Sequence, residues 1–261
     1  MRKMHAGELR QLTGCRYPVL VRLERLVTQS LGGKRRGPPF GRPTRDIVVA
    51  ALAKLRGGDA YRTLAVYLGI PHVTLQRYTL LVCSVLSRQL ASLPAEARQW
   101  LLVDTTSTRV RSTSAAHYSG YKHHRCVKVQ VVTTDGGMVL DVSGAYPGSV
   151  HDKTVWDREF QRVRGVLTLP ALGDKAYAGA RGEGSVLFRP IRRNEVRWKQ
   201  DRETCRLANR ALSRSRVRVE HAFARIKAFR VLSGQFQMGV NTYACVFRAV
   251  AFICNANLTH A

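Results

Sequence analysis

The change in hydrophobic period near residue 98 is the feature that most constrains the fold. Before it, apolar residues recur at helical spacing, as in residues 45–56 (RDIVVAALAKLR) and 60–68 (AYRTLAVYL). After it, short apolar runs are separated by turn residues, which is typical of strands. The sequence therefore predicts a small all-α region at 44–92 and an α/β domain at 98–261.

The all-α region contains a break between two short helices. Gly69, Ile70 and Pro71 interrupt the helical pattern, which resumes over residues 72–86. Two short helices joined by a Gly-containing turn are the layout of a helix-turn-helix, whose second helix enters the major groove through its N-terminal side chains. Those predicted to contact DNA are His72, Thr74, Gln76 and Arg77. A plain helical packing module has the same pattern and remains an alternative.

The N-terminal part, residues 1–43, is expected to be a helical segment that ends in a basic linker. Residues 32–43 read GGKRRGPPFGRP, where Gly and Pro oppose helix formation and most other residues are cationic. Such a segment either lies along a DNA groove or only connects its neighbours.

The α/β domain is expected to begin with antiparallel strands. Asp135, Gly136 and Gly137 separate two apolar runs and predict a hairpin turn. The expected order is strands at 100–103, 127–133 and 138–145, a helix at 152–163, strands at 166–172 and 185–191, and helices at 197–212, 214–232 and 243–255. This order is typical of an α/β fold with an antiparallel start.

The charge of the chain limits its partners. Lys and Arg number 43 against 17 Asp and Glu, which gives a net charge of +26. This charge disfavours a neutral small molecule as substrate and favours a polyanion, with nucleic acid as the first candidate. A general spread of Arg through codon bias is the alternative.

Cysteines and apolar runs indicate the compartment. The six cysteines are scattered without a CxxC pair, so neither a zinc ribbon nor a disulfide framework is expected. No apolar run has the length of a membrane span, and none follows the early cations of the N-terminus. We expect a soluble protein of the cytoplasm, associated with the nucleoid, without a membrane partner.

Three carboxylates are the candidates for chemistry. Asp104 and Asp174 each follow an apolar strand, where α/β sheets place ligand-handling groups. Glu220 is the one acid in RSRVRVEHAFARIKAFRVL (214–232) and lies beside the apolar stripe of that helix. Together they would hold Mg²⁺, and a pair of such ions can activate a nucleophile and stabilise a leaving oxygen. Lys175, Arg216 and Lys227 are the nearby cations expected to contact the DNA backbone.

Each acid also has a structural alternative. Asp104 would serve as a turn or cap residue, Asp174 as a loop acid, and Glu220 as a partner of Arg216 or Arg225. Asp152 opens a helix, where an acid suits the helix dipole, and is also a further candidate for the site. His151 and His221 adjoin acids and either assist proton movement, contact substrate or pack.

Five stretches carry a family resemblance. They are VDTT at 103–106, HYSGYKHHRCVKVQVVTTDGG at 117–137, PGSVHD at 147–152, LGDKAYAG at 172–179 and LSRSRVRVEHAFARIKAF at 212–229. In these stretches the chain resembles DDE-type insertion-sequence transposases of the branch related to Harbinger-like nucleases. Thr105 and Ala176 depart from the family pattern, because members of that family more often have Gly at the corresponding positions.

The resemblance implies a fold, a site and an activity. The fold would be an RNase H-like catalytic domain, a mixed sheet flanked by helices, preceded by a helix-turn-helix domain. The catalytic and metal-binding acids would be Asp104, Asp174 and Glu220 with two divalent ions, Mg²⁺ or Mn²⁺. Such an enzyme would bind the terminal inverted repeats of its element and catalyse strand cleavage and strand transfer into target DNA.

The resemblance also implies a homo-oligomer, assembled on double-stranded DNA, because two element ends must be held together. Two alternatives stay open. One is a catalytically inactive or domesticated DNA-binding protein derived from a transposase, and the other is a different RNase H-like nuclease.

Overall fold

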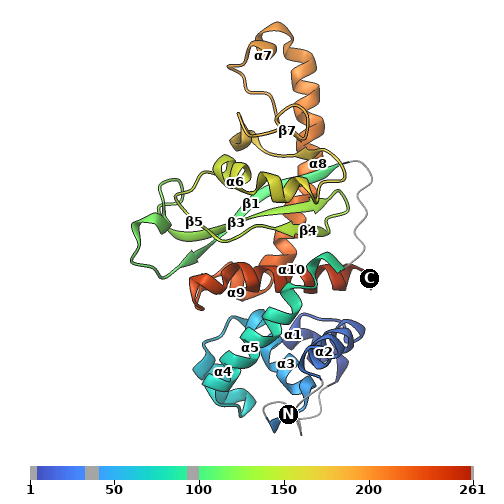
Figure 1. Cartoon of the computed structure of the whole chain (residues 1–261), viewed down its shortest axis with the longest axis vertical. Coiled ribbons are helices and arrows are strands. Elements are labelled where there is room, and N and C mark those ends of the chain that lie inside the picture. Colours follow the sequence, from blue (N-terminus) through green and yellow to red (C-terminus); the bar gives the residue numbers. More distant parts are fainter. Residues whose placement is uncertain (1–4, 33–40, 93–99, 260–261) are drawn as a thin grey trace. The chain divides into compact units, whose positions relative to one another are not determined.

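The computed structural model of the protein describes residues 5–32, 41–92 and 100–259, and these form two compact units. The first unit contains the described residues up to 92, together with Thr108–Arg111 and residues 225–259. The second contains residues 100–107 and 112–224 (Figure 1). This division groups the C-terminal residues with the N-terminal helices, whereas the sequence analysis assigned them to the α/β domain. The domain boundaries themselves stay a prediction, and most of the basic linker lies outside the described residues.

The first unit is helical. Its helices are α1 (Ala6–Thr13), α2 (Tyr17–Leu31), α3 (Thr44–Gly57), α4 (Tyr61–Leu68), α5 (His72–Ser87), α9 (Arg230–Ser233) and α10 (Tyr243–Thr259), with 3₁₀ turns at Leu90–Ser92 and Val240–Thr242. A short strand, β8 (Gln235–Phe236), pairs in parallel with Arg109 and Val110.

The core of the first unit forms where α3 and α10 pack against α5. Phe247, Val250 and Phe252 of α10 are fully buried, and the helix is apolar on nearly all sides, as expected of a helix enclosed by others. Among the described residues, no helix combines the length and apolarity that a bilayer span requires.

The break between α4 and α5 lies where the sequence predicts it. Gly69 ends α4 in the left-handed conformation with φ of 61°, which glycine adopts at little cost. Pro71 then precedes α5, where its missing N–H is not needed. The helices predicted at 45–56, 60–68 and 72–86 are confirmed as α3, α4 and α5, with small differences at their ends.

The second unit is a mixed α/β layer structure. Its strands are β1 (Leu101–Val110, of which the last residues belong to the first unit), β2 (Tyr118–Ser119), β3 (His124–Thr134), β4 (Val139–Val142), β5 (Tyr146–Pro147), β6 (Ala171–Leu172) and β7 (Leu187–Phe188). Its helices are α6 (Asp152–Arg164), α7 (Val196–Gln200) and α8 (Arg202–Lys227), which ends in the first unit, with 3₁₀ turns at Ala115–His117 and Lys175–Tyr177.

The sheet order is β2-β3-β1-β6-β7, with β4 and β5 also paired to β3. The β1–β6 and β6–β7 pairs are parallel, whereas β2, β4 and β5 run antiparallel to β3. The expected hairpin joins β3 to β4 through Asp135, Gly136 and Gly137, the last with φ of 81°. The predicted α/β fold class, with a mixed sheet flanked by helices, is confirmed for the second unit.

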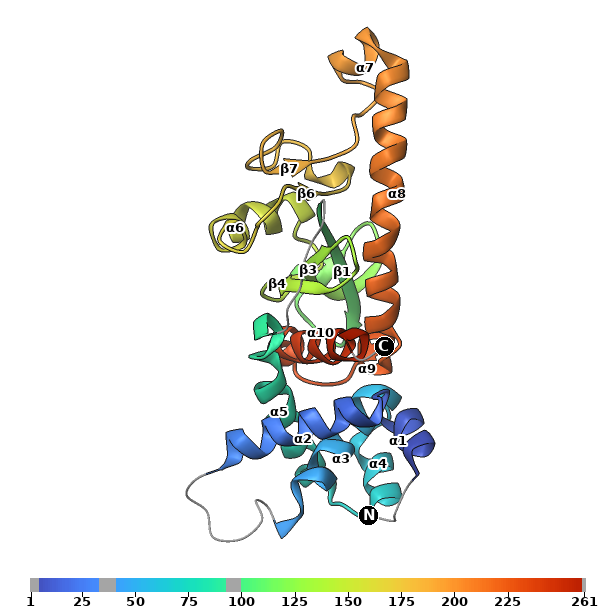
Figure 2. The ribbon, with the colours of Figure 1, turned by 90° about the vertical axis from the view of Figure 1, so that its right-hand side faces the viewer.

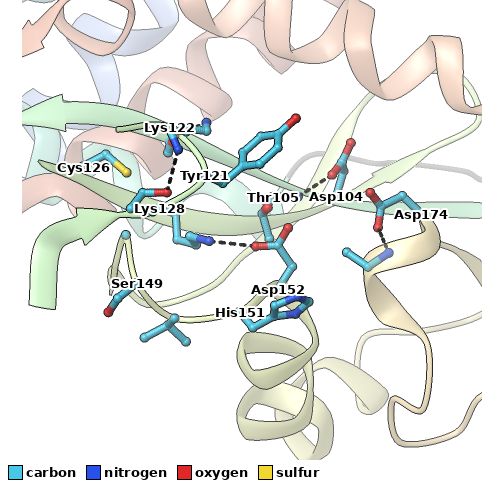
Figure 3. A pocket seen from close by; sticks show the side chains of 16 residues that line it. Asp104, Thr105, Tyr121, Lys122, Cys126, Lys128, Ser149, His151, Asp152 and Asp174 are labelled. Carbon is cyan, nitrogen blue, oxygen red and sulfur yellow. Dashed lines mark hydrogen bonds and ion pairs between the residues drawn. The ribbon is translucent and has the colours of Figure 1, made fainter. Parts of the chain in front are cut away.

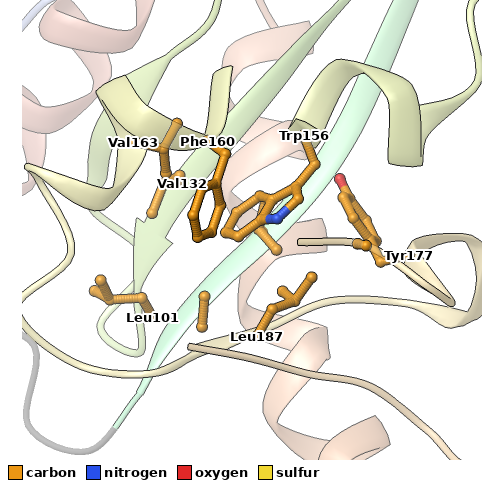
Figure 4. Close-up of a cluster of buried hydrophobic side chains, with 10 residues drawn as sticks. Leu101, Val132, Trp156, Phe160, Val163, Tyr177 and Leu187 are labelled. Carbon is orange, nitrogen blue, oxygen red and sulfur yellow. The ribbon is translucent and has the colours of Figure 1, made fainter. Parts of the chain in front are cut away.

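The two faces of β1 bind different helices. Leu101 and Val103 pack with Trp156 of α6 (Figure 4), whereas Leu102 packs with Val219 of α8. Figure 2 accordingly shows the sheet between α6 and α8. Because successive side chains of a strand point to opposite faces, Asp104 follows Leu102 onto the face covered by α8.

The strand expected at 100–103 is longer than predicted. Asp104 was expected to end it, but β1 continues to Val110, so Asp104 lies within the strand. The residues that follow are polar, yet Thr105, Thr106 and Thr108 are β-branched and favour extended backbone. The strand expected at 166–172 is reduced to β6, after Pro170, and Asp174 follows it two residues later.

The boundaries predicted for the helices at 197–212 and 214–232 are wrong. Most of both ranges forms one helix, α8, of 26 residues. The hydroxyls of Ser213 and Ser215 donate to the carbonyls of Asn209 and Ala211, so they bond within the helix and do not end it. The segment carries neither Gly nor Pro, and the helix ends at Lys227.

Trp156 provides a test of this core. Its ring is fully buried and meets Tyr177 edge-on at a centroid distance of 6.1 Å, and its Nε1 donates to the Arg181 carbonyl at 2.9 Å. We expect Trp156→Ala to lower the free energy of unfolding in urea by about 3–5 kcal/mol, because it leaves a cavity. Gln161→Ala, on the exposed side of α6, should change it by less than about 0.5 kcal/mol. Equal effects of the two variants would contradict this packing.

Candidate active site

A cavity of about 530 Å³ opens in the second unit beside β1 (Figure 3). Five segments form its walls: β1 from Asp104 to Ser107, the β2–β3 turn, β3 at Cys126 and Lys128, the loop that leads into α6, and the turn after β6. Asp104, Asp152 and Asp174 all line it, as do Lys122 and Lys128. The cavity is therefore polar and carries charges of both signs.

Asp104 is held by a donor on each oxygen. The backbone N–H of Thr105 donates to Oδ1 at 2.7 Å, and Arg216 Nη2 of α8 donates to Oδ2 at 3.2 Å. The side chain is only 19% exposed. Burial raises the pKa of the Asp104 carboxyl from 3.8 to about 6; Arg216 and the Thr105 N–H oppose this rise, and the nearby Asp174 adds to it.

Asp174 begins the 3₁₀ turn Lys175–Tyr177. Its Oδ1 accepts a hydrogen bond from the Ala176 N–H at 2.7 Å, which fixes the side chain at the cavity wall. Gly173 precedes it, and a Cβ there would lie 2.9 Å from Cδ2 of Tyr177. The glycine therefore allows the Tyr177 ring to pack directly under the strand end. In Figure 3 the carboxylates of Asp104 and Asp174 are neighbours.

Tyr177 lies close to the acids but was not singled out from the sequence. The residue is fully buried, and its hydroxyl has no hydrogen-bond partner among the described residues. Burial raises its pKa well above the ordinary value, and the charges of Asp104, Asp152 and Asp174 raise it further. The Tyr177 hydroxyl therefore stays protonated.

Asp152 is the third acid of the cavity. It opens α6 and forms an ion pair with Lys128, with Nζ and Oδ1 2.9 Å apart. Its position at the start of α6 and in the cavity wall is compatible with both expected roles, an interaction with the helix dipole and a part in the site. His151 also lines the cavity, whereas His221 is exposed on α8 and does not.

Glu220 is not brought into the cavity. Its side chain is exposed and forms no hydrogen bond or ion pair within the described residues, and it is absent from the cavity wall. Arg216, one of the two cations weighed as its partner, contacts Asp104 instead. In the described part of the chain, no three His, Cys, Asp or Glu residues are grouped to hold a metal ion.

The donor set of the cavity nevertheless fits a divalent cation. Asp104 and Asp174 present carboxylate oxygens to the same space, and the buried Asp104 has one guanidinium partner. Mg²⁺ binds through one or two carboxylates and completes its shell with water and substrate phosphate. Two neighbouring carboxylates, one with a raised pKa, form the kind of site that added positive charge stabilises.

The residues expected to bind DNA lie in several places. On α5, His72, Gln76 and Arg77 are exposed and Thr74 is half-buried. Lys175 and Lys227 are exposed, and neither lines the cavity.

Further cavity residues were missed in the sequence: Tyr121, Lys122 and Lys128 lie inside the quoted stretch 117–137 but were not given roles. The sequence signal that could have identified them is an aromatic residue, Tyr121, followed directly by a cation, Lys122.

One comparison with known proteins identifies the family of the chain. A protein-family model described as DDE superfamily endonuclease matches residues 103–255, which is more than half of the chain. The match includes β1, β3, α6 and α8, and with them Asp104, Asp174 and Glu220. The chain belongs to the DDE superfamily endonucleases, a family whose substrate is DNA and whose members typically use divalent metal ions. Searches of curated proteins and of solved structures return no match.

The raised pKa of Asp104 predicts a gain in stability when its charge is removed. Above pH 6 the folded protein holds a buried carboxylate whose charge burial disfavours. Without divalent cations, Asp104→Asn should therefore raise the free energy of unfolding at pH 7 by up to about 3 kcal/mol. The gain should shrink as the pH falls from 6 towards 4, because the wild-type carboxyl then becomes neutral in the folded state.

Urea unfolding in EDTA at pH 7 and pH 4 measures this difference. Glu203→Gln removes a carboxylate from an exposed position of α8 and serves as the control, with little change expected. An Asp104→Asn protein that is less stable than wild type at pH 7 would contradict the assignment.

Proposed function

We propose that this protein is a DDE transposase, which binds the terminal inverted repeats of its own element and catalyses strand cleavage and strand transfer. The observation that supports it most is the pairing of Asp104 with Asp174 in one cavity, within the region that matches DDE superfamily endonucleases. An acid pair in a polar cavity of a strongly basic chain suits a reaction on a phosphodiester.

In this proposal Asp104, Asp174 and Glu220 hold two divalent ions, Mg²⁺ or Mn²⁺. When bound, such ions activate the attacking oxygen and stabilise the leaving oxygen of an in-line displacement. The chain contributes fixed ligands, because the N–H groups of Thr105 and Ala176 orient the two aspartates. Glu220 is assigned as the third ligand because it follows Arg216 by four residues, on the side of α8 that reaches Asp104.

Arg216 has a role of its own in this site. Its guanidinium is three-quarters buried and donates to Asp104 Oδ2 at 3.2 Å, which opposes the rise in the pKa of that carboxyl. It therefore keeps Asp104 ionised and ready to bind a cation. Its expected contact to the DNA backbone stays part of the proposal, because a guanidinium also binds phosphate.

The DNA-binding part of the proposal rests on α4 and α5. These helices and the turn at Gly69 act as a helix-turn-helix, in which His72, Thr74, Gln76 and Arg77 contact base edges. Three of these side chains are exposed at the start of α5, as such a role requires. Lys175 and Lys227 then bind the phosphate backbone outside the cavity.

Two element ends must be held together for strand transfer. We therefore infer a homo-oligomer that forms on double-stranded DNA and associates with the nucleoid.

Removal of each acid tests the catalytic assignment. Asp104→Asn, Asp174→Asn and Glu220→Gln should each lower Mg²⁺-dependent nicking of a plasmid that carries the element ends by at least about 100-fold. Loss of a ligand removes stabilisation of charge in the transition state. The amounts of nicked and linear plasmid on agarose gels measure the rate.

Glu203→Gln, elsewhere on α8, is the matched control and should nick at the wild-type rate. Wild-type nicking by Glu220→Gln would remove that residue from the site. Wild-type nicking by Asp104→Asn would refute the enzymatic proposal. Absence of nicking by the unaltered chain, with binding retained, would favour an inactive derivative of a transposase.

The dependence of DNA affinity on salt tests the basic surface. With a net charge of +26, we expect at least six phosphate contacts, and affinity for duplex DNA should fall by roughly 10³-fold or more between 50 and 200 mM NaCl. Fluorescence anisotropy of a labelled duplex over a salt series measures the slope. A nearly flat response would mean that phosphate contacts do not govern binding.

A further inference from the structure

The turn between β2 and β3 carries an aromatic side chain at the edge of the acid cavity. Tyr121 lines the same space as Asp104 and Asp174 and is 92% exposed, more than any other large apolar side chain among the described residues. In Figure 3 its ring extends from the turn across the cavity toward Asp104. One ring face is therefore available to a ligand that reaches the acids.

The turn that carries Tyr121 has a defined conformation. The Ser119 carbonyl accepts the His123 N–H at 2.8 Å, and the Ser119 hydroxyl accepts the Lys122 N–H at 3.3 Å. His123 adopts φ of 54°, a left-handed conformation that non-glycine residues take infrequently. Because these contacts fix the backbone on both sides of it, Tyr121 is presented outward and is not simply a loose loop residue.

The cavity wall beside Tyr121 suits a phosphate and a sugar. Lys122 Nζ donates to the Ser107 hydroxyl, so its ammonium is held against β1 within the cavity. Ser119 and Ser149 add hydroxyl groups to the same wall. An aromatic face, a fixed cation and hydroxyl donors are together the groups that bind a nucleotide, with the base stacked and the backbone neutralised.

The geometry excludes a base that remains inside a duplex. Both faces of a paired base in the interior of a duplex are covered by its neighbours, so a protein ring can cover a whole face of such a base only after the base has been extruded. Stacking on a protein aromatic ring is correspondingly a feature of single-stranded or extruded bases. Tyr118, on β2, is also exposed, at 46%, but it does not line the cavity. It is therefore not placed to stack on a base that lies beside the acids.

We propose that Tyr121 stacks on an unpaired base of the strand that is cut. The turn Gly120–His123, with the Tyr121 ring and the Lys122 ammonium, then forms a subsite for a single-stranded or extruded nucleotide beside Asp104 and Asp174. The identity of the ligand as DNA rests on the proposed function. The subsite itself adds a preference for unpaired DNA near the acids, which neither the acid pair nor the α5 contacts would supply.

The affinity for single strands tests this subsite. Labelled single-stranded and fully paired oligonucleotides are titrated in EDTA with the unaltered chain, Tyr121→Ala, Tyr121→Trp and Tyr118→Ala, and binding is read by fluorescence anisotropy. Loss of one stacking ring should weaken single-strand binding by about 5- to 100-fold in Tyr121→Ala. Tyr121→Trp should restore it, while duplex binding and the Tyr118→Ala protein should change by less than about twofold.

A base analogue reports the stacking directly. 2-Aminopurine in the single strand should be quenched on binding to the unaltered chain and less so with Tyr121→Ala. An equal loss of single-strand and duplex affinity in Tyr121→Ala, or no loss at all, would overturn the subsite.

The two proposals fail separately. If plasmid is nicked normally and Tyr121→Ala binds single strands like wild type, only the subsite is refuted. If no DNA is nicked but Tyr121→Ala loses single-strand binding selectively, the subsite stands and the catalytic proposal fails.

Discussion

The contact between Arg216 and Asp104 is the interaction on which the candidate site depends. Alternation along β1 turns Asp104 toward the face that α8 covers, so its carboxylate is buried under a helix. A buried carboxylate without a cation partner would be neutral, and a neutral acid is a poor metal ligand. Arg216, on α8, limits this neutralisation, whereas Asp174, in the turn after the neighbouring parallel strand β6, favours it by raising the pKa of Asp104. The ionisation state of Asp104 therefore depends on both segments.

Local patterns in the sequence were sufficient for much of the fold. Gly69 and Pro71 mark the break between α4 and α5, and Asp135 to Gly137 mark the β3–β4 hairpin, because turn residues act through their own backbone preferences. The family resemblance, carried by motifs between 103 and 229, is confirmed by the family match over 103–255. The helix-turn-helix assignment and the roles of the site residues remain predictions.

The features that the sequence did not predict correctly are the length of β1, the continuity of α8 and the partner of Asp104. They depend on interactions between distant segments or on side-chain hydrogen bonds inside a helix. Nothing near Asp104 in the sequence indicates Arg216, which lies 112 positions later. The polar residues 105–108 belong to a strand because β1 lies beside β3 in the sheet, a neighbour that comes later in the chain. The helix boundary expected between residues 212 and 214 is absent, and the hydroxyls of Ser213 and Ser215 donate to carbonyls within α8. The packing of α10 on α5 is likewise a contact between remote segments that no local pattern records.

The continuity of α8 has a consequence for how this chain can vary. Leu212, Val219 and Phe223 pack on the sheet along one face of α8, and Arg216 lies beside that face, where it reaches Asp104. Insertion or deletion of a single residue there would rotate everything beyond it by about 100° around the helix axis, separating the apolar contacts from the cation. The number of residues between Leu212 and Phe223 is therefore fixed by the contacts that this stretch makes with the sheet and with Asp104.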